Sequence, residues 1–382
     1  MIYLDHAATT PVTEAVLAEM LPYFREYSGN ASSVYTAGRE ARKAVEKARR
    51  QVARNIGADA NEILFTSGGS ESDNFAIKCA AFALRKKGMH IITSAVEHPA
   101  VLNTCRWLET QGFKVSYVAS DCDGRIHPEY VLDAIRPETI LISVMAANNE
   151  VGTIEPVKDI GRIAREHGIV FHTDAVQAVG AMPVDVNNWY ADMLSLSAHK
   201  FGGPKGIGAL FVRKGTRVDP LIHGGKQERG LRAGTENVPA IVGLGKAIED
   251  ASANLESYIV KTTVLRDRLT NGILRTVEGA HLNGPEKNRL PNNSSIRFDG
   301  IDGEALLLRL DLEGIAASAG SACTAGSQQV SHVLQTMGLS EAQAKSSLRL
   351  TVGGENSEEE IDETIRIIKE IVEDLRKMFH HL

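Results

Sequence analysis

Residues 195–211 read SLSAHKFGGPKGIGALF, and this stretch decides the fold. A short apolar strand ends at Ser197 and runs directly into His199, Lys200 and a glycine-rich turn, after which a second strand begins at Gly208. Glycine lets the backbone approach a ligand closely, and open α/β sheets bind ligands beyond the carboxyl ends of their strands. Lys200 is therefore a candidate amine nucleophile, although a solvated lysine in a turn would fit this segment alone.

Short β-rich runs alternate with helical stretches from about residue 60 to residue 215. The β-rich runs cover residues 62–66, 90–94, 114–119, 140–145, 169–173, 193–197 and 208–213. Alternation of this kind is typical of a largely parallel sheet with helices on its faces. The sequence therefore predicts an α/β fold.

Helical patterns flank this region on both sides. Apolar residues at helical spacing predict an amphipathic helix that ends before Gly57. Near the C-terminus, Ser357 and Glu360 have the spacing of a capping box ahead of an apolar stripe. The pattern of the sequence changes near residue 255, which suggests a domain boundary there. We therefore predict a large domain over residues 15–255 and a smaller α+β domain formed by residues 1–14 and 256–382.

Composition narrows the function classes. The 382 residues are 43% hydrophobic and 24% charged, with a formal net charge of −6. A phosphate backbone is bound by runs of lysine and arginine, and the sequence has none, so direct nucleic-acid binding is not expected. The N-terminal segment lacks a signal peptide's basic start, and no apolar run reaches the length of a membrane helix. We expect a cytoplasmic protein without a membrane anchor.

Four cysteines are too scattered for a disulfide framework or a zinc site. They are Cys79, Cys105, Cys122 and Cys323, without a C-x-x-C pair. Cys79 and Cys105 fall in helix-like stretches and are expected in the core. Cys122 lies in a turn-like segment and receives no function. Cys323 stands alone in SAGSACTAGS (318–327), among small residues only.

A second strand-to-turn junction, FTSGGSESDN (65–74), is a candidate phosphate site. A strand runs into Gly68 and Gly69 and then into a helix that Ser70 could cap. Such a helix start offers backbone N–H groups and the positive end of the helix dipole to a phosphate. The alternative is an ordinary capped turn. Neither the dinucleotide fingerprint nor the P-loop pattern occurs in the chain.

Two more polar positions follow strands. Asp174 ends an apolar strand in VFHTDAVQAVG (170–180), with Gln177 one helical turn further on. A buried carboxylate is costly unless it meets a cation, and a protonated ring nitrogen would serve; the alternative is that Asp174 caps the next helix. His98 in VEHPAV (96–101) could stack on a planar ligand or be an ordinary loop residue.

Together these signals indicate one ligand. A phosphate held at a helix start, a ring nitrogen opposite Asp174 and a carbonyl carbon for Lys200 are all features of pyridoxal 5′-phosphate.

The sequence resembles the cysteine desulfurases, which are fold-type I pyridoxal-phosphate enzymes of the class V aminotransferase group. The likeness runs nearly end to end, through YLDHAATTP (3–11), FTSGGSESDN (65–74), VEHPAV (96–101), ANNEVGT (147–153), HTDAVQAVG (172–180), SAHKFGGPKGIG (197–208), RAGTEN (232–237) and SAGSACTAG (318–326).

The resemblance implies roles for individual residues. Lys200 would form the Schiff base with the cofactor, Asp174 would pair with the ring nitrogen, Gln177 would donate to the phenolic oxygen and His98 would stack on the ring. The phosphate would be held by Gly69, Ser70, Ser197 and His199, with Thr235 reaching it from the second subunit of a homodimer. Asn149 and Arg349 would hold the substrate carboxylate, which a guanidinium can bind bidentately.

Cys323 would be the catalytic thiol. The SAGSACTAG form resembles the group of desulfurases with a long, mobile cysteine loop. The implied reaction converts L-cysteine to L-alanine and leaves a persulfide on Cys323, for delivery to an acceptor such as an iron–sulfur scaffold or a tRNA-thiolating enzyme.

Other functions stay open at the level of the sequence. A selenocysteine lyase or a class V transaminase would share the cofactor site, and the transaminase would not need Cys323. A protein of another class, a non-catalytic scaffold that binds a sulfur acceptor, would not need the cofactor at all.

Overall fold

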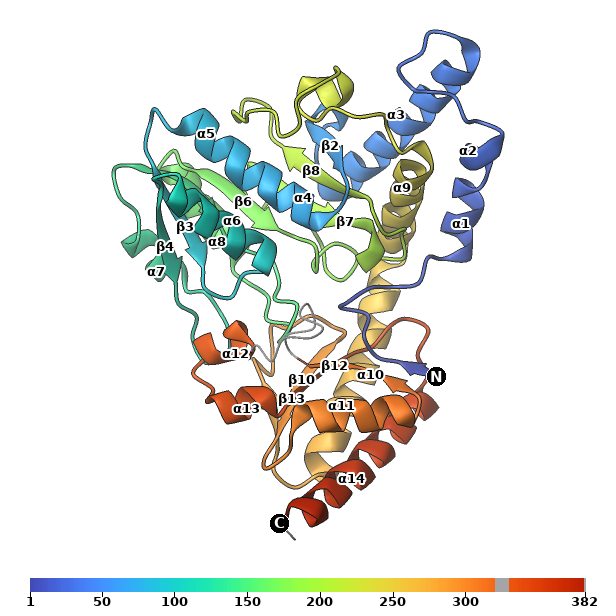
Figure 1. Ribbon diagram of the computed structural model, residues 1–382, viewed down its shortest axis with the longest axis vertical. Coiled ribbons are helices and arrows are strands. Elements are labelled where there is room, and N and C mark those ends of the chain that lie inside the picture. Colours follow the sequence, from blue (N-terminus) through green and yellow to red (C-terminus); the bar gives the residue numbers. More distant parts are fainter. Residues whose placement is uncertain (320–329, 381–382) are drawn as a thin grey trace.

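The computed structural model describes residues 1–319 and 330–380, so Cys323 lies outside the described residues. Figure 1 shows a large sheet surrounded by helices at one end of the molecule and a smaller sheet with its own helices at the other. The long helix α10 (Leu255–Thr276) runs from the first part into the second.

The large sheet has seven strands in the order β2-β8-β7-β6-β5-β3-β4. Strand β8 is antiparallel to both neighbours, and the other pairs are parallel. The strands are β2 (Ile63–Thr66), β3 (His90–Ser94), β4 (Lys114–Val118), β5 (Thr139–Ser143), β6 (Val170–Asp174), β7 (Met193–Ser197) and β8 (Gly208–Val212). Each coincides with a predicted β-rich run to within about two residues, so the predicted α/β fold is confirmed.

Helices cover both faces of this sheet. They are α1 (Glu14–Met20), α2 (Pro22–Arg25), α3 (Thr36–Ile56), α4 (Gly69–Asn74), α5 (Ala80–Leu84), α6 (Pro99–Thr110), α7 (Pro128–Asp133), α8 (Val157–Glu166) and α9 (Val238–Ala253). A π-helical segment (Phe75–Cys79) joins α4 to α5 without a break. Helix α3 packs on α9 and ends before Gly57, as predicted. Gly57 is the C-cap, and its φ of 73° is left-handed.

One capping prediction is wrong. Gly68, with φ 153°, is the N-cap of α4, and Ser70 is the second residue of the helix. Glycine tolerates a backbone conformation at this junction that a side chain disfavours, and the helix therefore starts two residues earlier than a Ser70 cap would place it. Ser70 thus belongs to the first turn of the helix instead of capping it.

The smaller part is built on a four-stranded antiparallel sheet of order β12-β13-β10-β9. Its strands are β9 (Ala280–Asn283), β10 (Asn293–Phe298), β12 (Ser318–Ala319) and β13 (Ser347–Thr351), and its helices are α10, α11 (Gly303–Leu312) and α14 (Glu358–His380). The N-terminal strand β1 (Ile2–Tyr3) pairs with β11 (Ile315–Ala316) in this same part. The first residues of the chain thus join the C-terminal region.

Helix α14 begins with the predicted capping box. The Glu360 N–H donates to Ser357 Oγ at 3.3 Å, and the Ser357 N–H donates to a Glu360 carboxylate oxygen at 3.2 Å. The buried stripe of α14, including Ile361 and Ile368, packs in one hydrophobic core with Leu4. This core supports the proposed pairing of residues 1–14 with the C-terminal region, while the domain boundaries themselves stay a prediction.

Two short helices cross between the parts. Helix α12 (His332–Thr336) places Val333 and Leu334 in the core of the large sheet, and helix α13 (Glu341–Lys345) adds Ala344, although their sequence position assigns both helices to the smaller domain. Among the described residues no helix is both long and apolar enough to cross a membrane.

Candidate functional site

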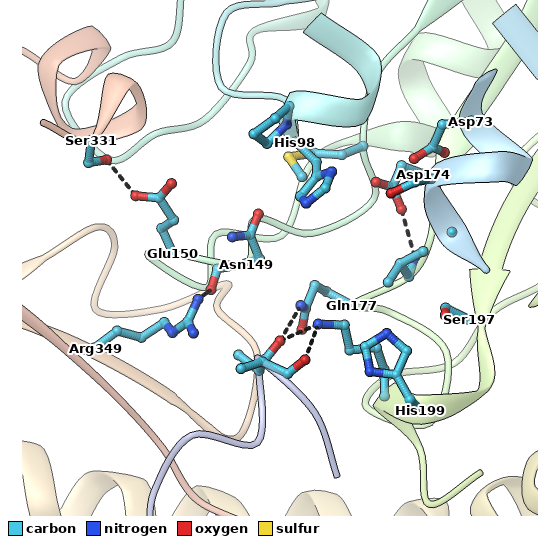
Figure 2. Close-up of a pocket in the computed structure, with 18 of the residues that line it drawn as sticks. Asp73, His98, Asn149, Glu150, Asp174, Gln177, Ser197, His199, Ser331 and Arg349 are labelled. Atoms are coloured by element: carbon cyan, nitrogen blue, oxygen red, sulfur yellow. Dashed lines mark hydrogen bonds between the residues drawn. The ribbon is translucent and has the colours of Figure 1, made fainter. Parts of the chain in front are cut away.

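A cavity of about 490 Å³ lies between the carboxyl edge of the large sheet and the smaller part (Figure 2). We call it the central cavity. Ten of the predicted site residues line it: Gly69, Ser70, His98, Asn149, Asp174, Gln177, Ser197, His199, Lys200 and Arg349. Thr235 is exposed and does not line it within this single chain, and Cys323 lies outside the described residues.

The sheet itself brings Asp174 and Lys200 together. Strands β6 and β7 are parallel neighbours, with Asp174 opposite Ser195, so both strands end at the same edge. Asp174 closes β6, while Lys200 follows β7 at the end of a 3₁₀ turn. Side chains at the carboxyl ends of adjacent parallel strands necessarily converge, which is why α/β folds place ligands there.

Lys200 reaches into the cavity and meets the N-terminal segment. Its Nζ donates to the carbonyl oxygens of Ala7 at 2.5 Å and Ala8 at 2.8 Å. Gln177 Nε2 donates to the same Ala7 oxygen at 3.0 Å. The two side chains therefore share one backbone carbonyl, which comes from the N-terminal segment of the chain.

Asp174 is a buried carboxyl on the opposite wall. One oxygen accepts the Val176 N–H at 2.9 Å. Burial raises the pKa of Asp174 to about 6, because the charged form is poorly solvated, while the Val176 N–H and the Lys200 charge act in the other direction. The ionised group is therefore available at neutral pH and strongly favours a nearby cation.

His98 is the N-cap of α6, and this role fixes which of its two ring nitrogens carries the proton. The Ala100 N–H donates to His98 Nδ1 at 3.1 Å. Burial lowers the pKa of His98 to about 4, with a smaller contribution from the Lys200 charge. The ring is therefore neutral at physiological pH, and since Nδ1 accepts a hydrogen bond, its proton is on Nε2.

Small and hydroxyl-bearing residues form another wall at the start of α4. Gly69, Ser70, Ser197 and His199 lie around the first turn of this helix. A Cβ at Gly69 would lie 2.7 Å from Val176 Cγ2, so a side chain does not fit there. Burial lowers the pKa of His199 to about 4, so its neutral ring can donate one hydrogen bond. This is the donor set of an anion site.

Arg349 enters the cavity from the smaller sheet. Its side chain is 3% exposed, and Nη2 donates to Asp5 Oδ1 at 2.8 Å. Nη1 donates to the Asn149 carbonyl oxygen at 3.1 Å, and the buried Nε has no hydrogen-bond partner among the described residues. A buried guanidinium with an unused donor is suited to a small carboxylate ligand.

Comparison with known proteins agrees with this geometry. Residues 2–364 match the family described as Aminotransferase class-V. The chain belongs to the class-V aminotransferase family. A cysteine desulfurase IscS of Methanosarcina thermophila is 53% identical over 377 residues, covering 99% of this chain and 93% of that protein. Another, from Dictyoglomus turgidum, is 50% identical and covers 98% of this chain and 95% of that protein.

Solved structures of related proteins share the fold of this class-V aminotransferase. A NifS-like protein has a TM-score of 0.93 at 41% identity and covers 98% of this chain and 100% of that chain. A structure described as SspA in complex with cysteine has a TM-score of 0.80 at 39% identity and covers 92% of this chain and 99% of that chain. The resemblance to cysteine desulfurases and the fold-type I architecture are thereby confirmed.

Class-V aminotransferases and cysteine desulfurases are pyridoxal-phosphate enzymes, and the residues of this cavity fit that cofactor. An amine at Lys200, a buried carboxyl at Asp174 and a donor-rich helix start are the groups that an aldehyde, a ring nitrogen and a phosphate require. Val176 packs against Gly69 at this helix start, so the backbone there stays close to the cavity without a side chain in between. The cofactor predicted from the sequence is thus the one that the family uses.

Several cavity residues were not predicted. Glu150 and Asp73 are buried acids in the walls, and Ser331 and His332 line the cavity from the start of α12. Ser331 Oγ donates to Glu150 Oε2, and burial raises the pKa of Glu150 to about 7. The sequence offered a weak signal for the acids only: Glu150 is next to the predicted site residue Asn149, and Asp73 lies three positions after Ser70 in the same motif.

Proposed function

We propose that the protein is a cysteine desulfurase that converts L-cysteine to L-alanine and carries the sulfur on Cys323. The observation that carries the proposal is the convergence of Lys200, Asp174, His98 and Arg349 on one cavity, in a chain about half identical to cysteine desulfurases along its whole length. When bound, pyridoxal 5′-phosphate supplies an electron sink that stabilises negative charge at the substrate α-carbon.

Four groups would hold the cofactor in place. Lys200 would bind it covalently, Asp174 would hold the proton of its ring nitrogen, and His98 would stack on the ring. The phosphate would be bound by Gly69, Ser70, Ser197 and His199. Ser197 and His199 flank the strand end from which Lys200 projects, so the phosphate and the amine would be fixed by one rigid element.

The substrate would be oriented by its carboxylate. Arg349 is fixed by Asp5 and by the Asn149 carbonyl, which leaves the unpaired Nε as a donor. Asn149 would add its side-chain amide. Holding the carboxylate on the side of the smaller sheet turns the amino group of cysteine toward Lys200, and preorganisation of this kind lowers the entropic part of the barrier.

Lys200 would move the proton of the substrate α-carbon, because its amine is the base that lines the cavity beside the proposed cofactor site. His98 would take part as a neutral ring: its pKa of about 4 keeps it uncharged, Nδ1 accepts the Ala100 N–H, and the Nε2 proton can form a hydrogen bond with the substrate or the cofactor without leaving the ring.

Cys323 would then attack the sulfur of the substrate as a thiolate. A sulfur–sulfur bond forms, the sulfur–Cβ bond breaks with its electron pair left on the carbon side, and that carbon takes a proton and leaves as part of alanine. Cysteine sulfur is thus retained on the protein as a persulfide.

The proposal also covers the oligomeric state, the sulfur acceptor and the cellular location. We propose a homodimer in which Thr235 of one subunit reaches the phosphate of the other, and a sulfur acceptor such as an iron–sulfur scaffold or a tRNA-thiolating enzyme. A cytoplasmic location fits a reaction that needs a thiolate, because that compartment keeps thiols reduced.

Mass spectrometry tests the proposal directly. Purified protein is incubated with L-cysteine and limiting reductant, and alanine is quantified while the peptides are mapped. We expect one extra sulfur on the peptide that contains Cys323 and alanine in the solution. Cys122→Ser is the matched control, because Cys122 is the exposed thiol of the described residues and should not be needed.

The variant Cys323→Ser should keep the cofactor and lose sulfur transfer. Continued turnover of cysteine to alanine by this variant would remove Cys323 from the reaction. Transfer of the amino group to a keto acid, with no sulfur on the protein, would instead indicate a transaminase, and a strong preference for selenocysteine would indicate a lyase.

A further inference from the structure

Asp73 is a carboxyl group in the wall of the central cavity that none of the roles above uses. It lies on α4 one helical turn after Ser70, so both side chains lie on the helix face that lines the cavity. Its side chain is 2% exposed, and Oδ1 has no hydrogen-bond partner among the described residues. Buried polar atoms nearly always have a hydrogen-bond partner, so the unpaired oxygen of Asp73 needs a physical explanation.

The groups around Asp73 do not supply a positive charge. Asp174 lies beside it (Figure 2), and burial followed by repulsion from Asp174 raises the pKa of Asp73 well above its usual value. Glu97, another buried acid, adds a smaller repulsion, while a hydrogen bond from Ser195 acts in the opposite direction.

His172 is the one basic side chain close to Asp73 among the described residues, with Nε2 3.7 Å from Asp73 Oδ1. Its two ring nitrogens lie 2.9 Å from Ser143 Oγ and 3.0 Å from Ser195 Oγ. Burial lowers the pKa of His172 to about 3, so the ring is neutral at physiological pH. The contact between His172 and Asp73 is therefore not an ion pair.

The Lys200 charge favours the ionised form of Asp174, while no positive charge among the described residues offsets the burial of Asp73. Two adjacent buried carboxyl groups with so little positive charge near them do not both ionise, because the second negative charge would be neither solvated nor paired. Such a pair holds one proton in common and titrates as a unit.

We propose that Asp73 is a positioning residue of the ring-nitrogen site: it stays a neutral carboxylic acid, shares its proton with the Asp174 carboxylate, and leaves a single negative charge opposite the ring. The proposal rests on the proposed function in taking the cavity as the pyridoxal-phosphate site. A single carboxylate balances a single protonated ring nitrogen, and the hydrogen bond from Asp73 fixes which way that carboxylate points. A second charge there would have no partner.

Infrared difference spectroscopy tests whether Asp73 is a neutral carboxylic acid. The spectra are recorded on the full-length protein in the oligomeric state in which it is purified, with and without pyridoxal 5′-phosphate. The spectrum of the native protein minus that of Asp73→Asn should contain the carbonyl band of a protonated carboxylic acid at neutral pH, in both forms. The exposed Asp311→Asn is the control and should give no such band. Asp73→Ser provides a second variant in case the amide disturbs folding, and it should lose the same band.

Cofactor affinity is the second measurement. Because an amide resembles a neutral acid, Asp73→Asn should bind pyridoxal 5′-phosphate with a Kd within about twofold of the native value. A band absent from the difference spectrum, or one that disappears when the cofactor binds, would overturn the proposal. So would a Kd raised by about tenfold or more in Asp73→Asn, which would mean that Asp73 pairs as an anion with the ring. Failure of sulfur transfer to Cys323 would refute the proposed function and leave the infrared result unchanged.

Discussion

Arg349 and Asp5 are 344 positions apart in the sequence and form a hydrogen-bonded ion pair of 2.8 Å in the wall of the central cavity. The pair joins strand β13 to the N-terminal segment at the point where the substrate carboxylate is proposed to bind. Since a guanidinium can rotate and Asp5 fixes one of its nitrogens, Asp5 sets the direction of the unused Nε donor.

Asp5→Asn should therefore raise the KM for L-cysteine. We expect an increase of about tenfold, equivalent to about 1.4 kcal/mol, with a smaller change in kcat. Steady-state kinetics of alanine formation measures both constants. Asp311→Asn, an exposed aspartate on α11, should behave like the native protein. An unchanged KM in Asp5→Asn would mean that Arg349 is oriented by other contacts.

Lys200→Ala should abolish covalent attachment of the cofactor. Nζ is the amine that lies in the cavity, held over the Ala7 and Ala8 carbonyls. Borohydride reduction followed by peptide mapping should find the pyridoxyl group on the peptide of residues near Lys200 in the native protein and nowhere in the variant. Lys214→Ala, which changes an exposed lysine, should keep the label. A labelled Lys200→Ala protein would place the attachment on another lysine.

Gly69→Ala should weaken cofactor binding through a steric clash. The new methyl group would lie 2.7 Å from Val176 Cγ2, so the start of α4 would have to move away from the phosphate site. We expect a Kd for pyridoxal 5′-phosphate about tenfold higher, measured by fluorescence titration of the cofactor-free protein. Adding Val176→Ala removes the clashing methyl groups and should restore most of the affinity. If the double variant binds no better than Gly69→Ala, the loss comes from the helix backbone and not from Val176.

Glu150 should make stability depend on pH. Burial raises its pKa from the model-peptide value of 4.5 to about 7 in the folded protein. The stability that neutral Glu150 contributes is thus fully present below about pH 4.5, and it is lost as the pH rises through about 7. Glu150→Gln stays neutral, so its free energy of unfolding relative to the native protein should rise across this window by about 3 kcal/mol.

Urea unfolding at several pH values measures this difference for Glu150→Gln. The exposed Glu313→Gln is the matched control and should follow the native curve. A parallel pH dependence in the native protein and Glu150→Gln would show that the Ser331 hydroxyl stabilises the ionised form of Glu150 enough to cancel its burial.

The strands and the main site were predictable because their signals are local. Most strands of the large sheet are buried apolar runs. Strand β6 ends with Asp174, and β7 ends with Ser197, directly before His199 and Lys200, so the site residues belong to the same runs that predict the strands. Gly68 replaced Ser70 as the cap of α4 because the backbone there takes a conformation suited to glycine, which the pattern of side chains does not report.

Long-range contacts were not predictable. The acceptors for Lys200 are the carbonyls of Ala7 and Ala8, and a backbone oxygen has no sequence signature. The pairing of Arg349 with Asp5 depends on the parallel bridge that brings Asp5 alongside Thr351, and a single sequence does not reveal it. The proton shared by Asp73 and Asp174 likewise depends on two buried side chains meeting across α4 and β6.

The N-terminal segment also ties the formation of the site to a much later part of the chain. Strand β1 pairs with β11, Leu4 packs in the core with α14, and Asp5 pairs with Arg349, which is synthesised 344 positions later. The cavity can therefore acquire its Arg349 wall only once strand β13 has been made. Synthesis that stops before β13 would leave the substrate-carboxylate side of the cavity without its guanidinium.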